Sequence, residues 1–91
     1  MSQSRLEKYV EILKALAING SLKNSQIASQ TKTDTKEAKR HLSFLVEKGL
    51  VEAKAINQKP LYSVTRRGIT VLIHFNELEV EALAVEQIKN L

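Results

Sequence analysis

Hydrophobic residues recur at helical spacing most clearly in a stretch of the chain that follows Asp34. Asp34 is a good helix N-cap, and Glu37 stands three residues on, where its side chain can reach back to the cap amide. The inward positions of this stretch are Ala38, Leu42, Leu45 and Gly49. Glycine is the residue that most often closes a helix in the left-handed conformation. The pattern therefore predicts a helix over residues 34–48 with one apolar face toward a core.

Two further helical patterns precede this stretch. The first covers residues 5–17, and its apolar stripe is widened by Ile12. The stripe consists of Leu6, Tyr9, Val10, Leu13, Leu16 and Ala17. Asn19 and Gly20 then predict a helix C-cap rather than a hairpin turn, because helical periodicity flanks them on both sides. Residues 24–30 predict a second, short helix.

After Gly49 the hydrophobic pattern alternates, as it does in strands. Residues 51–56 and 61–64 predict two short strands that form a hairpin. Between them, the polar turn contains Pro60, which we expect to prevent continuous pairing of the two strands. A hairpin of this size is marginally stable alone, so we expect it to pack on the helices.

A last helix is predicted to begin at the N-cap Thr65 and to run toward Leu91. Its first apolar residues can close the core, and they are Ile69, Leu72 and Ile73. Farther along, apolar residues recur at the spacing of a coiled-coil seam, and these are Val71, Phe75, Leu78, Ala82 and Val85. So much apolar surface on a protruding helix predicts a homodimer formed by two copies of this helix across a two-fold axis.

Composition narrows the classes of protein to consider. The 91 residues suffice for one domain with a modest core, and a hydrophobic content of 43% indicates a folded chain rather than a disordered one. The absence of cysteine excludes disulfides, thiolate metal sites and cysteine nucleophiles. No apolar run is long enough for a membrane span, and the first residues lack a signal-peptide pattern. We therefore expect no membrane association and a cytoplasmic location.

The net charge of +4 is unevenly distributed along the chain. Residues 1–67 contain thirteen lysines and arginines against six acids, a net charge of +7. Residues 68–91 contain one lysine against four glutamates, a net charge of −3. A basic body with an acidic tail predicts one surface for a polyanion and another for protein.

The chain offers little for catalysis or metal binding. His41 and His74 are interpreted as isolated, with no carboxylate or second histidine at ligand spacing. The acids of the last helix lie away from any expected cleft. The sequence contains no phosphate-binding glycine loop, nucleophile elbow or acid pair. We therefore expect no catalytic residue, no metal, no cofactor and no enzymatic activity.

Two motifs give the chain a family resemblance. The pattern A-x-x-x-L-x-x-L-x-x-x-G-L-V comprises Ala38, Leu42, Leu45, Gly49, Leu50 and Val51. The pattern Y-x-V-T-x-x-G comprises Tyr62, Val64, Thr65 and Gly68. With these motifs and this order of elements, the chain resembles winged helix-turn-helix DNA-binding proteins. It is most similar to small archaeal members that dimerise through a long C-terminal helix and act as regulators or chromatin proteins.

The resemblance implies an overall organisation. The fold class would be mainly α with a small two-stranded β-hairpin (α+β), a winged helix-turn-helix with a long C-terminal dimerisation helix. Residues 1–66 would form the DNA-binding part, and residues 67–91 would form the dimerisation helix of the same structural domain.

Such a fold presents the exposed side of helix 34–48 to the DNA major groove. The expected contacts on this helix are Thr35, Lys36, Lys39, Arg40 and Ser43. Arg40 is the best candidate for reading guanine, because a guanidinium group engages two acceptors on one base. Expected phosphate contacts are Lys23, Ser25, Lys32, Arg66 and Arg67, and expected wing contacts are Lys54, Asn57, Gln58 and Lys59. Phe44 projects near this surface, and we expect the hairpin or a partner helix to cover it.

The function expected from these features is double-stranded DNA binding by a homodimeric transcription regulator or nucleoid-associated protein. An alternative is a winged helix that docks an acidic protein, because fold does not fix function. RNA binding is disfavoured by the lack of exposed stacking aromatics. For each lysine of the predicted interface, an ordinary solvated position is the competing interpretation. The sequence identifies no small-molecule effector.

Overall fold

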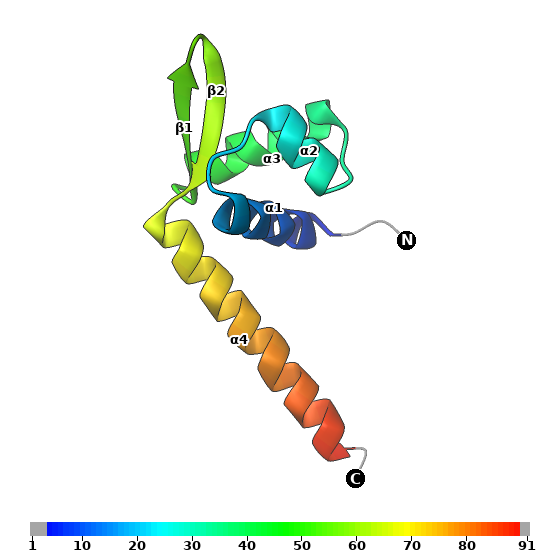
Figure 1. Ribbon diagram of the computed structural model, residues 1–91. Coiled ribbons are helices and arrows are strands. Elements are labelled where there is room, and N and C mark those ends of the chain that lie inside the picture. The colour runs from blue at the N-terminus through cyan, green and yellow to red at the C-terminus, as the bar shows by residue number, and fades with distance from the viewer. Residues whose placement is uncertain (1–3, 90–91) are drawn as a thin grey trace.

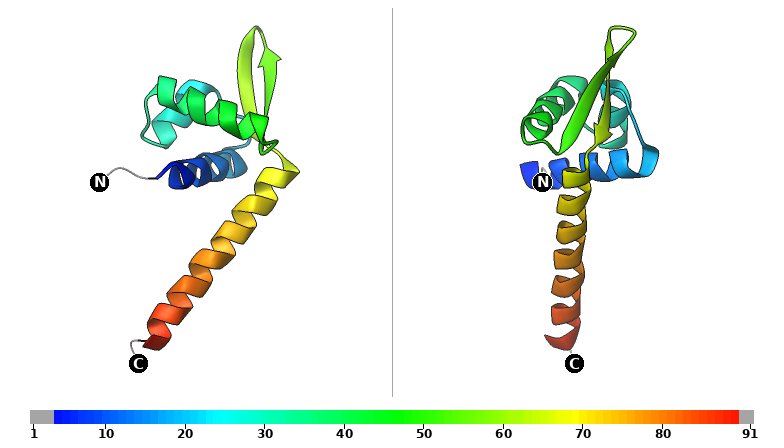
Figure 2. Two further views of the ribbon diagram at one scale, coloured as in Figure 1. Left: turned by 180° about the vertical axis from the view of Figure 1, so that it is seen from behind. Right: turned by 90° about the vertical axis from the view of Figure 1, so that its left-hand side faces the viewer.

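A computed structural model describes the backbone of residues 4–89 and the side chains of residues 4–78. The elements are α1 (Arg5–Asn19), α2 (Asn24–Gln30), α3 (Thr35–Glu47), β1 (Val51–Ile56), β2 (Lys59–Val64) and α4 (Arg66–Lys89). The predicted fold class, mainly α with a small two-stranded hairpin and a long C-terminal helix, is confirmed. Helices α1 to α3 form one body, while the hairpin and α4 project from it in opposite directions (Figures 1 and 2). The molecule is consequently elongated, with a longest extent of 57 Å.

The first helix buries a face that is rotated from the predicted stripe. Ile12 and Ala15 are buried, whereas Leu6 is 58% exposed and Ala17 is exposed. The prediction for Leu6 and Ala17 was therefore wrong. The cause is α2, which lies along the Ile12 side of α1 and is tied to it by hydrogen bonds such as that from Asn19 Nδ2 to Gln30 Oε1 (2.8 Å). A sequence pattern shows that a helix is amphipathic, but not from which side its neighbours approach.

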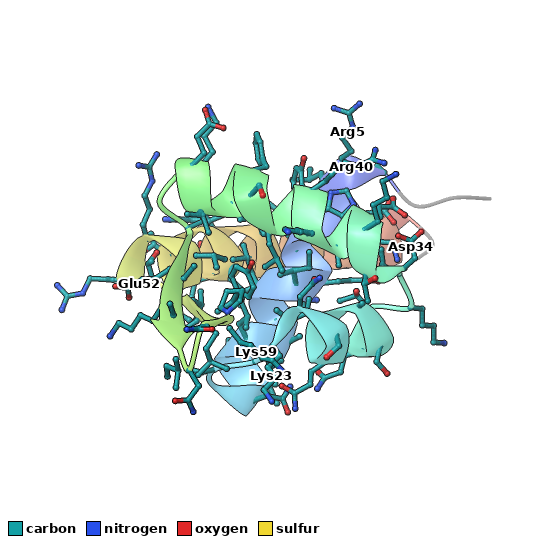
Figure 3. All side chains as sticks on the ribbon, turned by 90° about the horizontal axis from the view of Figure 1, so that it is seen from above. Arg5, Lys23, Asp34, Arg40, Glu52 and Lys59 are labelled. Carbon is teal, nitrogen blue, oxygen red and sulfur yellow. The ribbon has the colours of Figure 1, made fainter. Side chains whose placement is uncertain are left out.

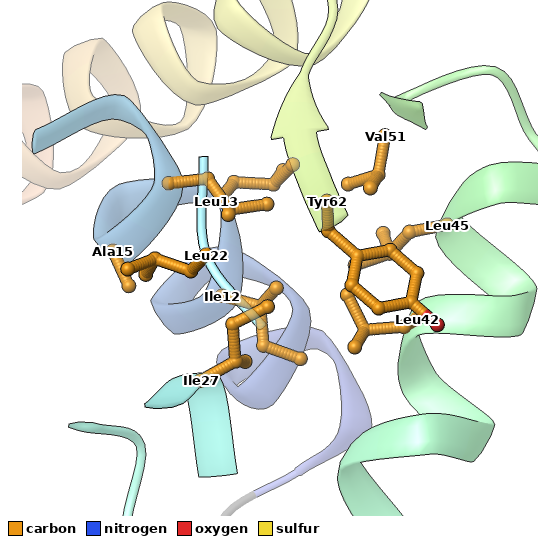
Figure 4. Packing of buried hydrophobic residues seen from close by; sticks show 10 residues of the cluster. Ile12, Leu13, Ala15, Leu22, Ile27, Leu42, Leu45, Val51 and Tyr62 are labelled. Atoms are coloured by element: carbon orange, nitrogen blue, oxygen red, sulfur yellow. The ribbon is translucent and has the colours of Figure 1, made fainter. Parts of the chain in front are cut away.

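The core lies between α1, α3 and the base of the hairpin, with α2 covering one side (Figure 4). Its buried members are Ile12, Leu13, Ala15, Leu16, Leu22, Ile27, Leu42, Leu45, Val51 and Tyr62. Ala38, Leu42 and Leu45 of the inward face predicted for α3 are buried, which confirms these three positions, whereas the fourth, Gly49, is exposed. Because the Leu42 and Leu45 side chains point into the core, the opposite side of α3 is left on the surface.

The hairpin pairs without interruption, so the predicted effect of Pro60 was wrong. The antiparallel register runs from Val51 opposite Val64 to Ile56 opposite Lys59, with Pro60 opposite Ala55. The turn therefore has only two residues, Asn57 and Gln58, both with positive φ (52° and 65°), as a type I′ turn requires.

The ladder tolerates Pro60 because of its place in the register. Neighbouring pairs of an antiparallel ladder alternate between hydrogen-bonded and non-bonded. Tyr62 uses its amide and carbonyl to bond Leu22 on the other side of β2, both at 2.9 Å, so these groups point away from β1. Pro60 is two residues earlier and has the same orientation, so its missing N–H is not needed for pairing with β1.

The last helix begins at a junction that joins three elements. The Thr65 hydroxyl donates to the Gly49 carbonyl (2.7 Å) and accepts from the Gly68 amide (3.1 Å), which confirms Thr65 as the N-cap of α4. Leu72 packs against the core as predicted, but Ile73 is 52% exposed, so the prediction that it closes the core was wrong. Beyond this first part, α4 leaves the body (Figure 1).

Candidate nucleic-acid interface

Local hydrogen bonds define both ends of α3. At its start, the Asp34 carboxylate accepts from the Glu37 amide at 2.7 Å, which satisfies one of the free amides of the first turn. At its end, the Gly49 amide bonds the Val46 carbonyl (3.0 Å) and the Leu50 amide bonds the Leu45 carbonyl (2.9 Å). This is a Schellman motif, and Gly49 has the positive φ (74°) that it requires. The sequence thus fixes the length of α3, and with it the extent of the exposed face.

The exposed face of α3 carries the side chains predicted to reach DNA. All five of them are exposed: Thr35, Lys36, Lys39, Arg40 and Ser43. Figure 3 shows Arg40 directed outward from the helix. Lysine and arginine on one exposed side, opposite buried leucines, give a cationic surface on a rigid element, which can neutralise phosphates or engage base edges.

The connection between α2 and α3 is held tightly. The Asn24 side-chain amide donates to the Thr35 carbonyl (3.1 Å), which joins the starts of the two helices. Within the turn, the Thr33 amide bonds the Ala28 carbonyl (2.9 Å), and Lys8 of α1 donates to the Thr31 carbonyl (2.8 Å). The two helices are therefore fixed relative to each other and to α1, as a helix-turn-helix requires.

The structure brings predicted backbone and wing contacts together. A hollow of about 340 Å³ lies between the tip of the hairpin and the start of α2. Lys23, Ile56, Asn57, Lys59, Pro60 and Leu61 line it. Lys23 and Lys59 both line this hollow, and Figure 3 shows them on the same side of the molecule. The two ammonium groups come from residues far apart in the sequence, and together they make this hollow attractive to an anion.

A second hollow, of about 330 Å³, separates α3 from the hairpin. It is lined by Ser43, Val46, Glu47, Ala53 and Tyr62. Only Ser43 was predicted to belong to the interface. Glu47 follows Arg40 and Ser43 on the same outward side of α3, so helical spacing alone would have identified it. Its carboxylate gives the C-terminal end of the face a negative charge.

Arg66 and Arg67 lie apart from the rest of the predicted interface, at the base of the hairpin where α4 begins (Figure 1). The Arg67 Nη1 atom is 3.9 Å from the position that a Cβ on Gly49 would occupy. This guanidinium is therefore beside the C-terminus of α3, where a cation interacts favourably with the helix dipole. A phosphate is not required to explain its position.

Phe44 is covered differently from the prediction. Its ring stacks on Tyr9 of α1, with centroids 4.6 Å apart and planes inclined by 12°. Tyr9 also contacts His41 edge-on, with centroids 5.3 Å apart. This stack covers part of Phe44, and 37% of the residue remains exposed within one chain.

His41 is also less isolated than predicted. Its Nε2 atom is buried and lies 3.5 Å from the Glu37 carboxylate, one turn earlier on α3. Glu37 thus faces along the helix toward His41 rather than back toward the cap. In the part of the chain that the structure describes, no group of three or more His, Asp or Glu side chains is arranged to hold a metal ion. Within the same part, no helix combines the length and the hydropathy needed to cross a membrane.

Comparisons with known proteins agree with this geometry. A family model described as winged helix-turn-helix matches residues 3–82. No curated protein matches the chain. Among solved structures, Sso10a-2, a DNA-binding protein from Sulfolobus solfataricus, has a TM-score of 0.80 at 18% identity, covering 97% of this chain and 90% of that one.

Two bacterial regulators share the same fold. A mutant MarR from E. coli has a TM-score of 0.81 at 22% identity, covering 91% of this chain and 63% of that one. A MarR family transcriptional regulator from Silicibacter pomeroyi has a TM-score of 0.76 at 24% identity, covering 86% of this chain and 54% of that one. The chain therefore spans only part of the length of these regulators. Because the family model matches residues 3–82 and the arrangement of helices and hairpin agrees with it, this protein belongs to the winged helix-turn-helix family.

Proposed function

We propose that this protein is a double-stranded DNA-binding transcription regulator or nucleoid-associated protein that acts by binding rather than by catalysis. The observation that carries the proposal is the exposed cationic side of α3, held by a fixed helix-turn-helix and flanked by the hairpin in a winged-helix fold. Helix α3 would enter a major groove, and the hairpin tip would lie along the adjacent backbone. This role implies that the protein works at the nucleoid, in the cytoplasm.

The residues of the proposed interface have two tasks. Arg40 would read a guanine, while the other α3 contacts would be Thr35, Lys36, Lys39 and Ser43. Phosphate contacts would come from Lys23, Ser25, Lys32, Arg66 and Arg67, and wing contacts from Lys54, Asn57, Gln58 and Lys59. Lys23 and Lys59 are the best supported of these, because they line one hollow. Arg67 is the least supported, because it lies beside the end of α3.

We also propose that the protein is a homodimer through α4. Val71 is 38% exposed and Leu78 is 64% exposed, and both lie on the seam predicted from the sequence together with Phe75. Ala82 and Val85 continue that seam, and their side chains lie outside the described residues. Two copies of α4 that cover these apolar side chains would set the distance between two DNA half-sites.

The test separates base reading from phosphate contact. Arg40→Ala is expected to weaken binding to a selected site by about 1–3 kcal/mol and to relax its sequence preference. Lys59→Ala is expected to weaken binding to all sequences to a similar degree and to lower the salt dependence. Titration of selected and random duplexes with both variants measures the difference. If both variants lose the same affinity on every sequence, Arg40 does not read bases.

A further inference from the structure

A second pattern runs along α3 beside the proposed duplex interface. Positions four residues apart form one row on a helix, and here the row consists of Lys36, Arg40, Phe44 and Lys48. All four side chains are exposed. Phe44 therefore has a cation one helical turn before it and another one turn after it.

The Phe44 ring is held in one orientation by its neighbours. Tyr9 lies nearly parallel to it on one face, at a centroid distance of 4.6 Å. Tyr9 also contacts the ring of the buried His41 in a T-shaped arrangement, with the ring planes inclined by 83°. The Lys48 Nζ atom approaches the Phe44 ring at 5.7 Å from its centroid. An aromatic ring that is backed by a second ring and remains 37% exposed is a fixed stacking surface.

In duplex DNA the faces of the bases are stacked on one another inside the helix, so they are not available to stack on the Phe44 ring. A single strand exposes those faces, and proteins bind it by combining cations for the backbone with aromatic rings for the bases. The nearest acid to Phe44 on α3 is Glu47, three residues later on the side that carries Ser43, while the Glu37 carboxylate lies 3.5 Å from His41. The row itself consists of three cations and one aromatic ring.

We propose that single-stranded DNA binds along this row, with one base stacked on Phe44 and the flanking phosphates held by Arg40 and Lys48. The Lys48 ammonium would move from the ring to a phosphate when the base arrives. The row consists of cations and an apolar ring, with no hydrogen-bond acceptor for a ribose 2′-hydroxyl, which favours DNA over RNA. Because Lys36 and Arg40 belong to both surfaces, single strand and duplex would compete for the protein.

The test uses the full chain and a fluorescein-labelled oligothymidylate of about fifteen nucleotides at about 50 mM salt. Phe44→Leu keeps an apolar side chain but removes the ring, and it is expected to weaken single-strand binding about tenfold. Phe44→Tyr restores a ring and should bind within about twofold of the wild type. Ile18→Ala is the matched control, because Ile18 is an apolar residue of α1 that is 81% exposed and lies outside both surfaces. Duplex binding should change by less than about twofold in all three variants.

Several results would overturn the proposal. These are a wild-type protein that does not bind oligothymidylate, a Phe44→Leu variant that loses single-strand and duplex affinity equally, and tighter binding to oligouridylate of the same length. If Phe44→Leu does not fold, an NMR titration of the wild type tests whether a base stacks on Phe44. The ring resonances of Phe44 and Tyr9 should shift upfield as the single strand is added, and unshifted rings would contradict stacking. The duplex proposal is measured separately and does not depend on this outcome.

Discussion

Gly68 shows how one residue sets the junction of three elements. It lies in the first turn of α4, and a Cβ built there would be only 2.2 Å from the Leu50 carbonyl oxygen and 2.6 Å from Val64 Cγ2. The neighbour at 2.2 Å is backbone, which cannot rotate away. The glycine of the Y-x-V-T-x-x-G motif is therefore needed for space rather than for an unusual φ.

Gly68→Ala is expected to lower the free energy of unfolding by about 1–3 kcal/mol, because overpacking outweighs the helix preference of alanine, which is about 1 kcal/mol. Thermal unfolding followed by circular dichroism measures the change. Thr70→Ala, two residues later with an exposed side chain, is the control and should shift stability by less than about 0.5 kcal/mol. A Gly68→Ala variant as stable as the wild type would show that Leu50 does not pass this close.

Single residues also mark the limit of what the sequence reveals. The caps Asp34, Gly49 and Thr65 act through atoms a few positions away, so local rules predicted them correctly. The stack of Phe44 on Tyr9 depends on how α1 crosses α3. No local pattern contains that information, so the stack of Phe44 on Tyr9 was not predicted.

At the scale of elements, the hairpin depends on its turn. Asn57 and Gln58 both have positive φ, and Asn-Gly is the pair that favours such a turn, because glycine has no Cβ to clash. Glutamine at the second position is therefore strained. The alternation of Val51 to Ile56 predicted a strand, but only the register shows why Pro60 fits opposite Ala55.

Gln58→Gly is expected to stabilise the protein by about 0.5–1 kcal/mol, through relief of the left-handed strain. For a domain of this size that corresponds to a rise in Tm of several degrees, roughly 2–8 °C. Gln58→Val is the opposing variant, since a β-branched residue is disfavoured at positive φ, and it should lower Tm. An unchanged or lower Tm for the glycine variant would show that the turn is not of this type.

At the scale of the molecule, the basic and the acidic parts of the chain lie in different parts of the structure. The basic body contains the helix-turn-helix and hairpin, and the acidic part of the chain belongs to α4, which projects away from them (Figure 2). The order of elements was predictable because each has its own periodicity and caps. The direction in which α4 diverges from α1 was not predictable from the sequence. The exposure of Ile73, which results from that divergence, was therefore not predictable either.

Leu78→Ser is expected to convert the proposed dimer into a monomer while leaving the fold intact, since Leu78 is 64% exposed within one chain. Light scattering measures the mass, and circular dichroism checks the fold. Asn76→Ser changes an exposed residue on another side of α4 and should stay dimeric. A Leu78→Ser protein that keeps the mass of the wild type would place the interface elsewhere.

The most direct test of the central claim is binding to a random-sequence duplex of about 30 base pairs as a function of salt concentration. We predict micromolar or tighter binding at about 50 mM salt, with a slope of log affinity against log salt of roughly −5 or steeper, because several phosphates are neutralised. Absence of binding at that salt concentration would contradict the account. The cationic face of α3 would then be a surface for an acidic protein instead of DNA.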